Sequence, residues 1–242
     1  MKASKTSAPI LVAAPHSTIV DGLAVVQTFS SVVAKQELAS WPIFGSIATV
    51  YQSVFIMRQA ADSRKNVHDL IKNRALEPSW PQVFLYPEGT VTNAKALIKF
   101  KVGAFKPGVP VQPVLIRHDT RQTGRFLDTL TKTWNQGHGY LGCLWLTLCQ
   151  FQTDLEFEFL PVYQPSEEEL INPIAYAENV RALMAEKLKI PMVDRSVSEF
   201  TSSTWSVDLA FYADRIEFAL PYFLDRKSYS KLKKYLKDFF TS

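Results

Sequence analysis

Short apolar runs that alternate with segments of helical periodicity constrain the fold of this chain more than any other feature. The runs are Ile10 to Ala14, Ser53 to Met57, Val83 to Tyr86 and Val109 to Ile116. Each has the length and composition of a buried strand. Apolar residues recur at helical spacing at Ile19, Leu23, Val26, Phe29 and Val33, and again over Pro173 to Leu188. Strands that alternate with helices predict an α/β fold with a mixed central sheet flanked by helices.

Three further segments extend this prediction. Charged and apolar residues alternate from Asp154 to Leu160, which predicts a half-exposed strand, and the Lys-rich stretch Asn93 to Phe105 predicts a loop and a helix. Beyond Pro191 the composition changes to Ser and Thr and then to basic and aromatic residues. We therefore expect one domain over residues 1–195 and a C-terminal extension over 196–242.

The extension has the pattern of a basic amphipathic helix. Its apolar residues at helical spacing are Tyr229, Leu232, Leu236, Phe239 and Phe240, and lysines decorate the other faces. Such a helix suits an anionic bilayer, and it equally suits docking on the domain with its lysines in solvent. The apolar stretch Tyr140 to Phe151 leaves a similar choice between an interfacial segment and a buried helix, because a dozen residues are too few to span a bilayer.

Composition narrows the class of partner and the compartment. The chain has 242 residues, of which 47% are hydrophobic and 21% charged, as expected of a globular domain. A formal net charge of +4 is too small to argue for nucleic acid, so no nucleic-acid partner is expected, whereas it suits an anionic membrane surface. Cys143 and Cys149 would lie roughly 9 Å apart on a helix, too far for a disulfide, which favours a reducing compartment.

His16 and Asp21 straddle the point where the first strand gives way to a helix. With His16 in the loop and Asp21 in the first helical turn, the carboxylate can fold back onto one imidazole nitrogen and leave the other to act as a base. Such a pair removes a proton from a substrate hydroxyl and needs no enzyme nucleophile. An isolated pair of this spacing is more often a loop histidine beside an acid favoured by the helix dipole.

Two other segments place polar groups at strand ends. Tyr86 to Thr90 follows an apolar strand, and there Gly89 permits close approach of a ligand while Glu88 can hold a hydroxyl or an arginine. Arg58 follows the strand at 54–57, where a guanidinium can bind a phosphate through two hydrogen bonds. A solvated acid in a turn and a surface arginine are the ordinary alternatives.

Together these segments resemble the four sequence blocks of the glycerolipid acyltransferases, in the family order. The blocks are His16 to Asp21, Phe55 to Arg58, Tyr86 to Thr92 and Val109 to Val114. The sequence around these blocks resembles that of the lysophosphatidylcholine acyltransferases. The similar stretches are APHSTIVDGLAV, PEGTVTNAKALIKFKVGAFKPGVPVQPVLIRH, LTLCQF and AENVRALMAEKLKIP. The resemblance covers roughly residues 8 to 195 and implies a glycerolipid acyltransferase-like fold.

The resemblance also implies a reaction and a set of roles. The enzyme would move a fatty acyl group from acyl-CoA, a co-substrate, to the hydroxyl of a lysophospholipid, most simply lysophosphatidylcholine, without cofactor or metal. His16 would be the general base and Asp21 its orienting acid. The phosphate-bearing acceptor would meet Arg58, Glu88, Gly89 and Thr90, and the acyl group would meet Val111 and Pro113. The alternatives are lysophosphatidic acid or glycerol 3-phosphate as acceptor, and a non-catalytic membrane lipid-binding protein.

The chain departs from its apparent relatives in several places. Gln52 and Met57 replace a Gly and an Asp that many relatives carry in the second block, and Val91 replaces a Cys in the third. Relatives usually carry hydrophobic membrane segments before the first block, and these are absent here; no D-x-[DN]-x-[DN]-G loop follows, so no calcium site is expected. The resemblance still implies membrane association, at the endoplasmic reticulum with the site facing the cytosol. A serine hydrolase is disfavoured because the chain lacks a G-x-S-x-G elbow.

Overall fold

The computed structural model describes residues 1–40, 42–56, 61–118, 144–145, 147–148 and 154–197, within a unit Met1–Val197. Arg58, both cysteines and residues 198–242, which make up nearly all of the predicted basic extension, lie outside the described residues. The boundary expected at residue 195 stays a prediction.

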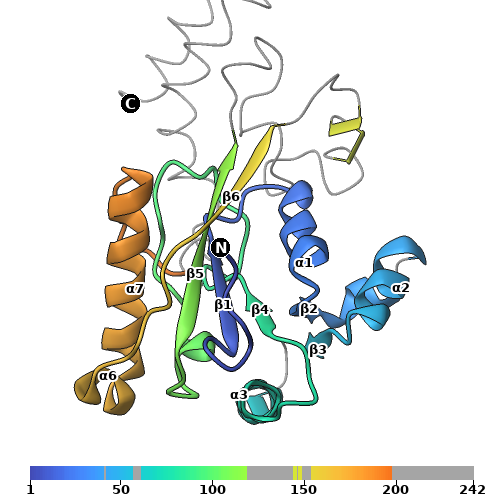
Figure 1. Cartoon of the computed structure of the whole chain (residues 1–242). Helices are drawn as coiled ribbons and strands as arrows, with labels where there is room; N and C mark the ends of the chain where they lie inside the picture. Colours follow the sequence, from blue (N-terminus) through green and yellow to red (C-terminus); the bar gives the residue numbers. More distant parts are fainter. Residues whose placement is uncertain (41, 57–60, 119–143, 146, 149–153, 198–242) are drawn as a thin grey trace, which may run out of the picture. The chain divides into compact units, whose positions relative to one another are not determined.

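A six-stranded sheet forms the centre of this unit (Figure 1). Its strands are β1 (Ile10–Ala14), β2 (Ser31–Lys35), β3 (Val54–Ile56), β4 (Val83–Leu85), β5 (Val111–His118) and β6 (Leu155–Phe159). They lie in the order β3-β2-β4-β1-β5-β6, and every neighbouring pair is parallel except β5 with β6. The predicted mixed α/β sheet is therefore confirmed.

Helices flank the sheet on both faces (Figure 1). The α-helices are α1 (Leu23–Thr28), α2 (Pro42–Val50), α3 (Ala61–Leu76), α6 (Glu167–Ile171) and α7 (Pro173–Leu188), and the 3-10 turns are η1 (Ile19–Gly22), η2 (Gln36–Ser40) and η3 (Val102–Ala104). The helix predicted at 173–188 is confirmed; it begins at Pro173, and the Asn172 side chain accepts from the backbone N–H groups of Ile174 and Ala175. Within the described part of the chain, no helix has both the length and the apolar character that a membrane crossing requires.

Two apolar cores use alternate residues of β1, whose five residues are all buried. Ile10, Val12 and Ala14 pack with buried residues of α3 and α7, whereas Leu11 and Ala13 pack with α1. Successive side chains of a strand point to opposite faces, so a strand buried on both faces reads as a continuous apolar run. The continuous apolar run at 10–14 therefore predicted the position of β1 correctly.

Two sequence predictions were wrong. The helical spacing from Ile19 to Val33 was expected to form one helix, but the helix ends where Phe29 takes a left-handed φ of 51°, and Val33 lies in β2. Pairing of β2 with β3 and β4 outweighs the helical periodicity.

The other error concerns the helix expected within Asn93 to Phe105, where only the short turn η3 forms. The backbone of this segment bonds to a distant part of the chain instead: the Leu97 N–H donates to the Pro191 carbonyl, and the Lys99 N–H donates to the Arg195 carbonyl. A backbone committed to these long-range bonds cannot make the bonds of a helix.

Candidate active site

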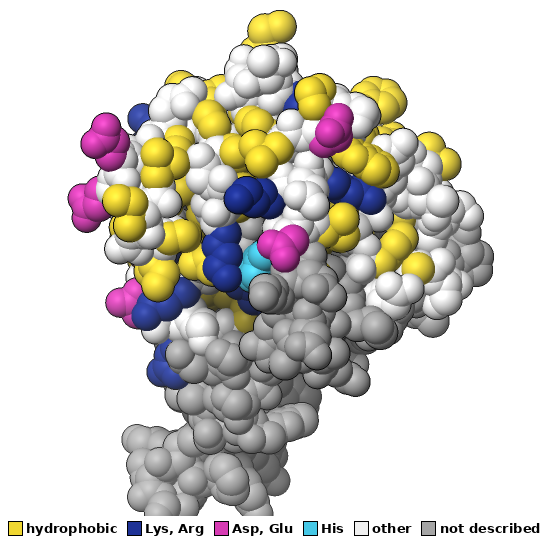
Figure 2. Space-filling model, turned by 90° about the horizontal axis from the view of Figure 1, so that it is seen from below, with side chains coloured by type: hydrophobic (Ala, Val, Ile, Leu, Met, Phe, Trp, Pro, Cys, Tyr) yellow, Lys and Arg dark blue, Asp and Glu magenta, His cyan; other side chains and the backbone are white. Residues whose placement is uncertain are grey.

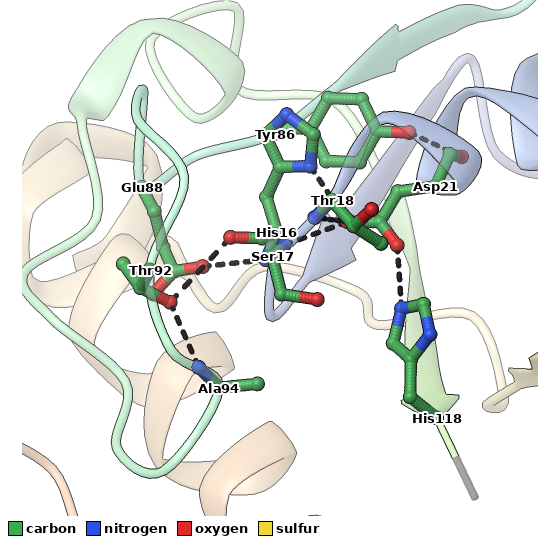
Figure 3. A network of polar contacts seen from close by, with 9 residues as sticks. All are labelled: His16, Ser17, Thr18, Asp21, Tyr86, Glu88, Thr92, Ala94 and His118. Atoms are coloured by element: carbon green, nitrogen blue, oxygen red, sulfur yellow. Dashed lines mark hydrogen bonds and ion pairs between the residues drawn. The ribbon is translucent and has the colours of Figure 1, made fainter. Parts of the chain in front are cut away.

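Three adjacent strands deliver the polar residues of the site to one edge of the sheet. β1 lies between β4 and β5 and is parallel to both, so the carboxyl ends of all three strands meet. His16 follows β1, Tyr86 and Glu88 follow β4, and His118 ends β5 (Figure 3). Ligand sites of open α/β sheets form at such edges.

The Asp21 carboxylate lies at the centre of the polar network. Asp21 is in η1, and its Oδ2 accepts from the backbone N–H groups of Ser17 at 2.6 Å and Thr18 at 3.0 Å. The same oxygen faces Nδ1 of His16 at 2.8 Å, and Oδ1 faces Nε2 of His118 at 2.7 Å (Figure 3). An acid at this position of a first helical turn is held by the backbone N–H groups that precede the turn.

Asp21 remains an anion although its side chain is fully buried. Burial alone would raise the pKa of its carboxyl, but hydrogen bonds from His118 and His16 hold that pKa well below its ordinary value. An ionised carboxylate only accepts hydrogen bonds, so Nδ1 of His16 and Nε2 of His118 each carry a hydrogen.

The His16 ring is held in one orientation by two contacts. Its Nδ1 hydrogen points to Asp21, and the ring stacks on Tyr86 with centroids 4.0 Å apart and planes 20° from parallel. The Tyr86 hydroxyl donates to the backbone carbonyl of Asp21 at 2.7 Å. Burial and then the charge of Asp21 raise the pKa of this hydroxyl well above its ordinary value, so it stays protonated. The His16 side chain keeps 17% of its surface exposed, so a substrate can reach the ring.

Glu88 lies behind the histidine loop, fully buried. Its Oε2 accepts from the His16 backbone N–H at 2.8 Å, and its Oε1 from the Ile98 N–H at 3.5 Å. Burial raises the pKa of the Glu88 carboxyl to about 8; the charge of Asp21 adds to this rise, while the two backbone donors and Arg181 oppose it. The structure thus places Glu88 as a brace of the loop, facing backbone groups.

Gly89 makes the turn that follows. Its φ is +67°, and a Cβ here would lie 2.6 Å from Cε and Nζ of Lys101. The Gly89 N–H donates to the Tyr86 carbonyl at 3.0 Å, and Thr90 is half-buried. A positive φ favours glycine, and any larger residue at this position would also have to displace the end of the Lys101 side chain.

The remaining predicted residues separate into two groups. Val111 and Pro113 are buried within β5, where they pair with Ile10 and Val12 of β1. Their predicted contact with the acyl group stays a prediction, as does the role of Arg58, which lies outside the described residues. The structure brings His16, Asp21 and the turn at 88–90 together at one strand edge.

Sequence reasoning missed two side chains of this site. His118 contacts Asp21, and Lys101 covers Gly89. The signal for His118 was its place at the end of a strand parallel to β1, but that signal depends on the strand order. Within the described ranges no cluster of three or more His, Cys, Asp or Glu side chains could hold a metal ion.

Comparison with known proteins places the chain among acyltransferases. Residues 1–117 match the family model described as Acyltransferase. Lysophosphatidylcholine acyltransferase 1 of Rattus norvegicus is 47% identical over 221 residues, which is 90% of this chain and 40% of that protein. Lysophosphatidylcholine acyltransferase of Drosophila melanogaster is 46% identical over 199 residues, 81% of this chain and 36% of that protein. The chain thus spans about 40% of the length of the curated relatives it matches.

One solved structure is also similar. It is the crystal structure of the 1-acyl-sn-glycerophosphate (LPA) acyltransferase PlsC from Thermotoga maritima, at 20% sequence identity and a TM-score of 0.48, covering 77% of this chain and 70% of that chain.

Proposed function

We propose that this chain, which belongs to the acyltransferase family, transfers a fatty acyl group from acyl-CoA to the free hydroxyl of a lysophospholipid. The observation that carries the proposal is the buried, ionised Asp21 against Nδ1 of a partly exposed His16. The likeness to lysophosphatidylcholine acyltransferases supports lysophosphatidylcholine as the acceptor.

The chemistry follows from the tautomer of His16. Because Nδ1 carries the hydrogen that faces Asp21, Nε2 is the nitrogen that takes the proton of the acceptor hydroxyl. The hydroxyl oxygen attacks the thioester carbonyl, a C–O bond forms, and the C–S bond breaks as coenzyme A leaves. The departing sulfur receives the proton from the His16 imidazolium. Asp21 stabilises that cation while it exists and remains ionised itself.

The acceptor phosphate would lie against the turn at 88–90. The Lys101 side chain is exposed, and its ammonium lies directly over Gly89, where it could contact the phosphate. Arg58 would add a second cation. Glu88 would serve the site indirectly, by fixing the His16 backbone. A phosphate that meets two cations is held in one orientation, with its hydroxyl directed to the base.

A membrane surface would supply both lipids. Leu23, the first residue of α1, and Phe29, which follows its last residue, are 54% and 74% exposed. In the apolar stretch 140–151, Trp145 and Leu148 are 68% and 71% exposed. Exposed apolar side chains of this size suit an interface with lipid. We expect localisation at the endoplasmic reticulum with the site facing the cytosol, which protease protection of isolated microsomes would test.

The surface assignment has a direct test in vesicle sedimentation. Serine substitutions at Trp145 and Leu148 should weaken binding at low and high salt alike, because apolar burial is insensitive to screening. Ile171, an 86% exposed apolar residue of α6, provides the matched control, and Ile171→Ser should bind as the parent does. If Ile171→Ser weakened vesicle binding as much as the serine substitutions at Trp145 and Leu148 do, the stretch 140–151 would not be the part of the chain that contacts the membrane.

The proposed reaction itself is tested by incubating the full chain with radiolabelled acyl-CoA and, separately, with lysophosphatidylcholine, lysophosphatidic acid and glycerol 3-phosphate. We expect labelled phosphatidylcholine as the main product, and none from His16→Ala. If another acceptor gave more labelled product, the predicted choline headgroup would be wrong. Binding of lysolipid vesicles without any labelled product would instead favour the non-catalytic lipid-binding protein.

A further inference from the structure

The Asp21 carboxylate faces two histidines, one on each oxygen. His16 occupies Oδ2 together with two backbone N–H groups, and His118 is 2.7 Å from Oδ1 (Figure 3). Among the hydrogen bonds of the described residues, the one to Oδ1 comes from His118. The proposed reaction assigns a role to His16 and leaves the second imidazole without one.

We propose that His118 is a positioning residue of the proposed acyl transfer: its Nε2 hydrogen holds the Asp21 carboxylate ionised and rotated so that Oδ2 faces Nδ1 of His16. This inference deepens the proposed function and rests on it. His118, at the end of β5, would thus act on the reaction through Asp21 and not by contact with the substrate.

Burial explains why Oδ1 needs this donor. Both Asp21 and His118 are removed from solvent, with side chains 0% and 3% exposed. Water therefore cannot replace a lost hydrogen bond, and a buried carboxylate oxygen without a donor favours either protonation or rotation of the group. Either change removes the anion that His16 requires.

Exposure also argues against the opposite assignment, in which His118 is the base and His16 the support. The His16 side chain is 17% exposed and stacks on Tyr86 at the strand edge, whereas His118 is almost fully covered. The second ring nitrogen of His118, Nδ1, is buried and has no hydrogen-bond partner within the described part of the chain. A base must reach the substrate hydroxyl, and His16 is the better placed.

The pH dependence follows from the groups that face Asp21. Among the described residues these are His16 from the loop after β1, Tyr86 and Glu88 from the segment after β4, and His118 from the end of β5. Hydrogen bonds from the two histidines lower the pKa of the Asp21 carboxyl, so loss of the His118 donor raises that pKa. Protons then bind the Asp21 carboxyl more tightly, so the loss of rate that follows its protonation, the acid limb of the rate profile, moves to higher pH.

A matched pair of substitutions isolates the donor. His118→Gln and His118→Met have side chains of similar length and volume, but only glutamine can donate an N–H to Oδ1. His118→Asn is a third variant of smaller size, whose amide is too short to reach Oδ1. We expect His118→Gln to keep kcat within about threefold of the parent, and His118→Met and His118→Asn to lower it about tenfold.

The pattern across parameters distinguishes positioning from packing. In the Met and Asn variants the acid limb of kcat should move to higher pH, while KM for acyl-CoA and for lysophosphatidylcholine changes by less than about threefold. The His118→Gln profile should overlay that of the parent. Equal kcat values and equal acid limbs for the Gln and Met variants would overturn the proposal, and the Asn variant supports the same comparison if the Met variant does not fold.

A second readout does not depend on activity. The 13Cγ resonance of Asp21, identified by its loss in Asp21→Asn, reports the ionisation of the carboxyl directly. It should titrate at higher pH in His118→Met and His118→Asn than in the parent and His118→Gln. If the parent transfers no acyl group but this pattern holds, the proposed function fails and with it the role of His118 in acyl transfer, while the effect of the His118 donor on the ionisation of Asp21 stands. If all four proteins titrate alike, the role of His118 fails whatever the activity.

Discussion

The loop after β1 and the turn after β4 each bury a carboxylate completely, yet the two carboxylates are in opposite states. Asp21 accepts from two imidazoles as well as two backbone N–H groups, and its pKa lies well below the ordinary value. Among the described residues, Glu88 accepts from two backbone N–H groups and no side chain; it lies near the charge of Asp21, and its pKa rises to about 8.

This difference shows that the donors around a buried acid decide its charge. Burial disfavours the charged form of both carboxyl groups and raises the pKa of each. Imidazole donors offset that cost at Asp21, and the resulting anion then disfavours a second one at Glu88. One site thus holds an ionised acid against the His16 ring and a largely protonated acid that holds the backbone of the same loop.

The largest expected effect comes from removing the base of the first region. His16→Ala should lower kcat by about 10²–10⁴-fold, because proton removal from the acceptor hydroxyl is lost. The melting temperature should stay close to that of the parent, since the ring is partly exposed and packs mainly on Tyr86. The measurement is labelled phosphatidylcholine formed per minute.

His68, on α3, provides the matched control for that experiment. His68→Ala should keep activity within about threefold of the parent. Near-parental activity in a folded His16→Ala protein would mean that the site uses another base.

The second effect concerns Glu88 and the stability of the fold. The folded-state pKa of about 8 exceeds the ordinary value of 4.5. The unfolded chain therefore releases this proton first, and the free energy of unfolding falls as pH rises from about 4.5 to 8, by on the order of a few kcal/mol. Glu88→Gln should flatten this interval in urea titrations carried out at a series of pH values.

Asp21 should behave in the opposite manner. Its folded-state pKa lies below the ordinary value of 3.8, so its contribution to stability is present above that value and is lost as pH falls below it. Asp21→Asn should flatten the acid end of the curve. The fall that Glu88 causes should remain but end below pH 8, because the charge of Asp21 contributes to the raised pKa of Glu88. If the free energy of unfolding depended on pH in the same way in Asp21→Asn and Glu88→Gln, the two acids would not have opposite effects on stability.

A smaller effect is expected from the cation that lies over the turn. Lys101→Met should raise KM for lysophosphatidylcholine about tenfold and leave KM for acyl-CoA nearly unchanged, because a phosphate contact of the acceptor is lost. Lys99→Met, at an exposed position two residues away, should leave both constants unchanged. Equal rises for both substrates in the Lys101 variant would argue that the lysine supports structure alone.

The smallest effect tests the backbone of the same turn. Gly89→Ala should destabilise the domain by about 1 kcal/mol, because φ is +67° and the added methyl group displaces Lys101. Gly22→Ala is the control, since a Cβ there meets nothing within 4 Å and the backbone is right-handed. Thermal unfolding of the two variants gives the comparison, and similar melting temperatures would contradict it.

The sequence predicted the loop after β1 better than the turn after β4. The contact between His16 and Asp21 follows from local geometry, because a strand, a short loop and one helical turn suffice to form it. The positions of β1 and β5 were equally accessible, since β1 is a continuous apolar run and the buried part of β5 is apolar except for Gln112.

What the sequence could not predict depends on contacts between distant segments. The bond between His118 and Asp21 requires β5 to lie beside β1, and β2 forms only through its partners, although its sequence has helical spacing. Glu88 was predicted to position the phosphate-bearing acceptor, and that role stays a prediction. Its contact with the His16 backbone, 72 residues away along the chain, becomes visible only once β4 is placed next to β1.

The contrast between the two acids is tested by comparing Asp21→Asn with Glu88→Gln in acyl transfer from acyl-CoA to lysophosphatidylcholine at pH 7. At this pH Asp21 is an anion and Glu88 is largely protonated. Each substitution replaces a carboxyl by an amide of the same shape. We expect a loss of at least about 10²-fold in kcat for Asp21→Asn, because the imidazolium loses its counter-charge, and a loss below about tenfold for Glu88→Gln. Equal losses, or a larger loss from Glu88→Gln in a folded protein, would contradict this expectation.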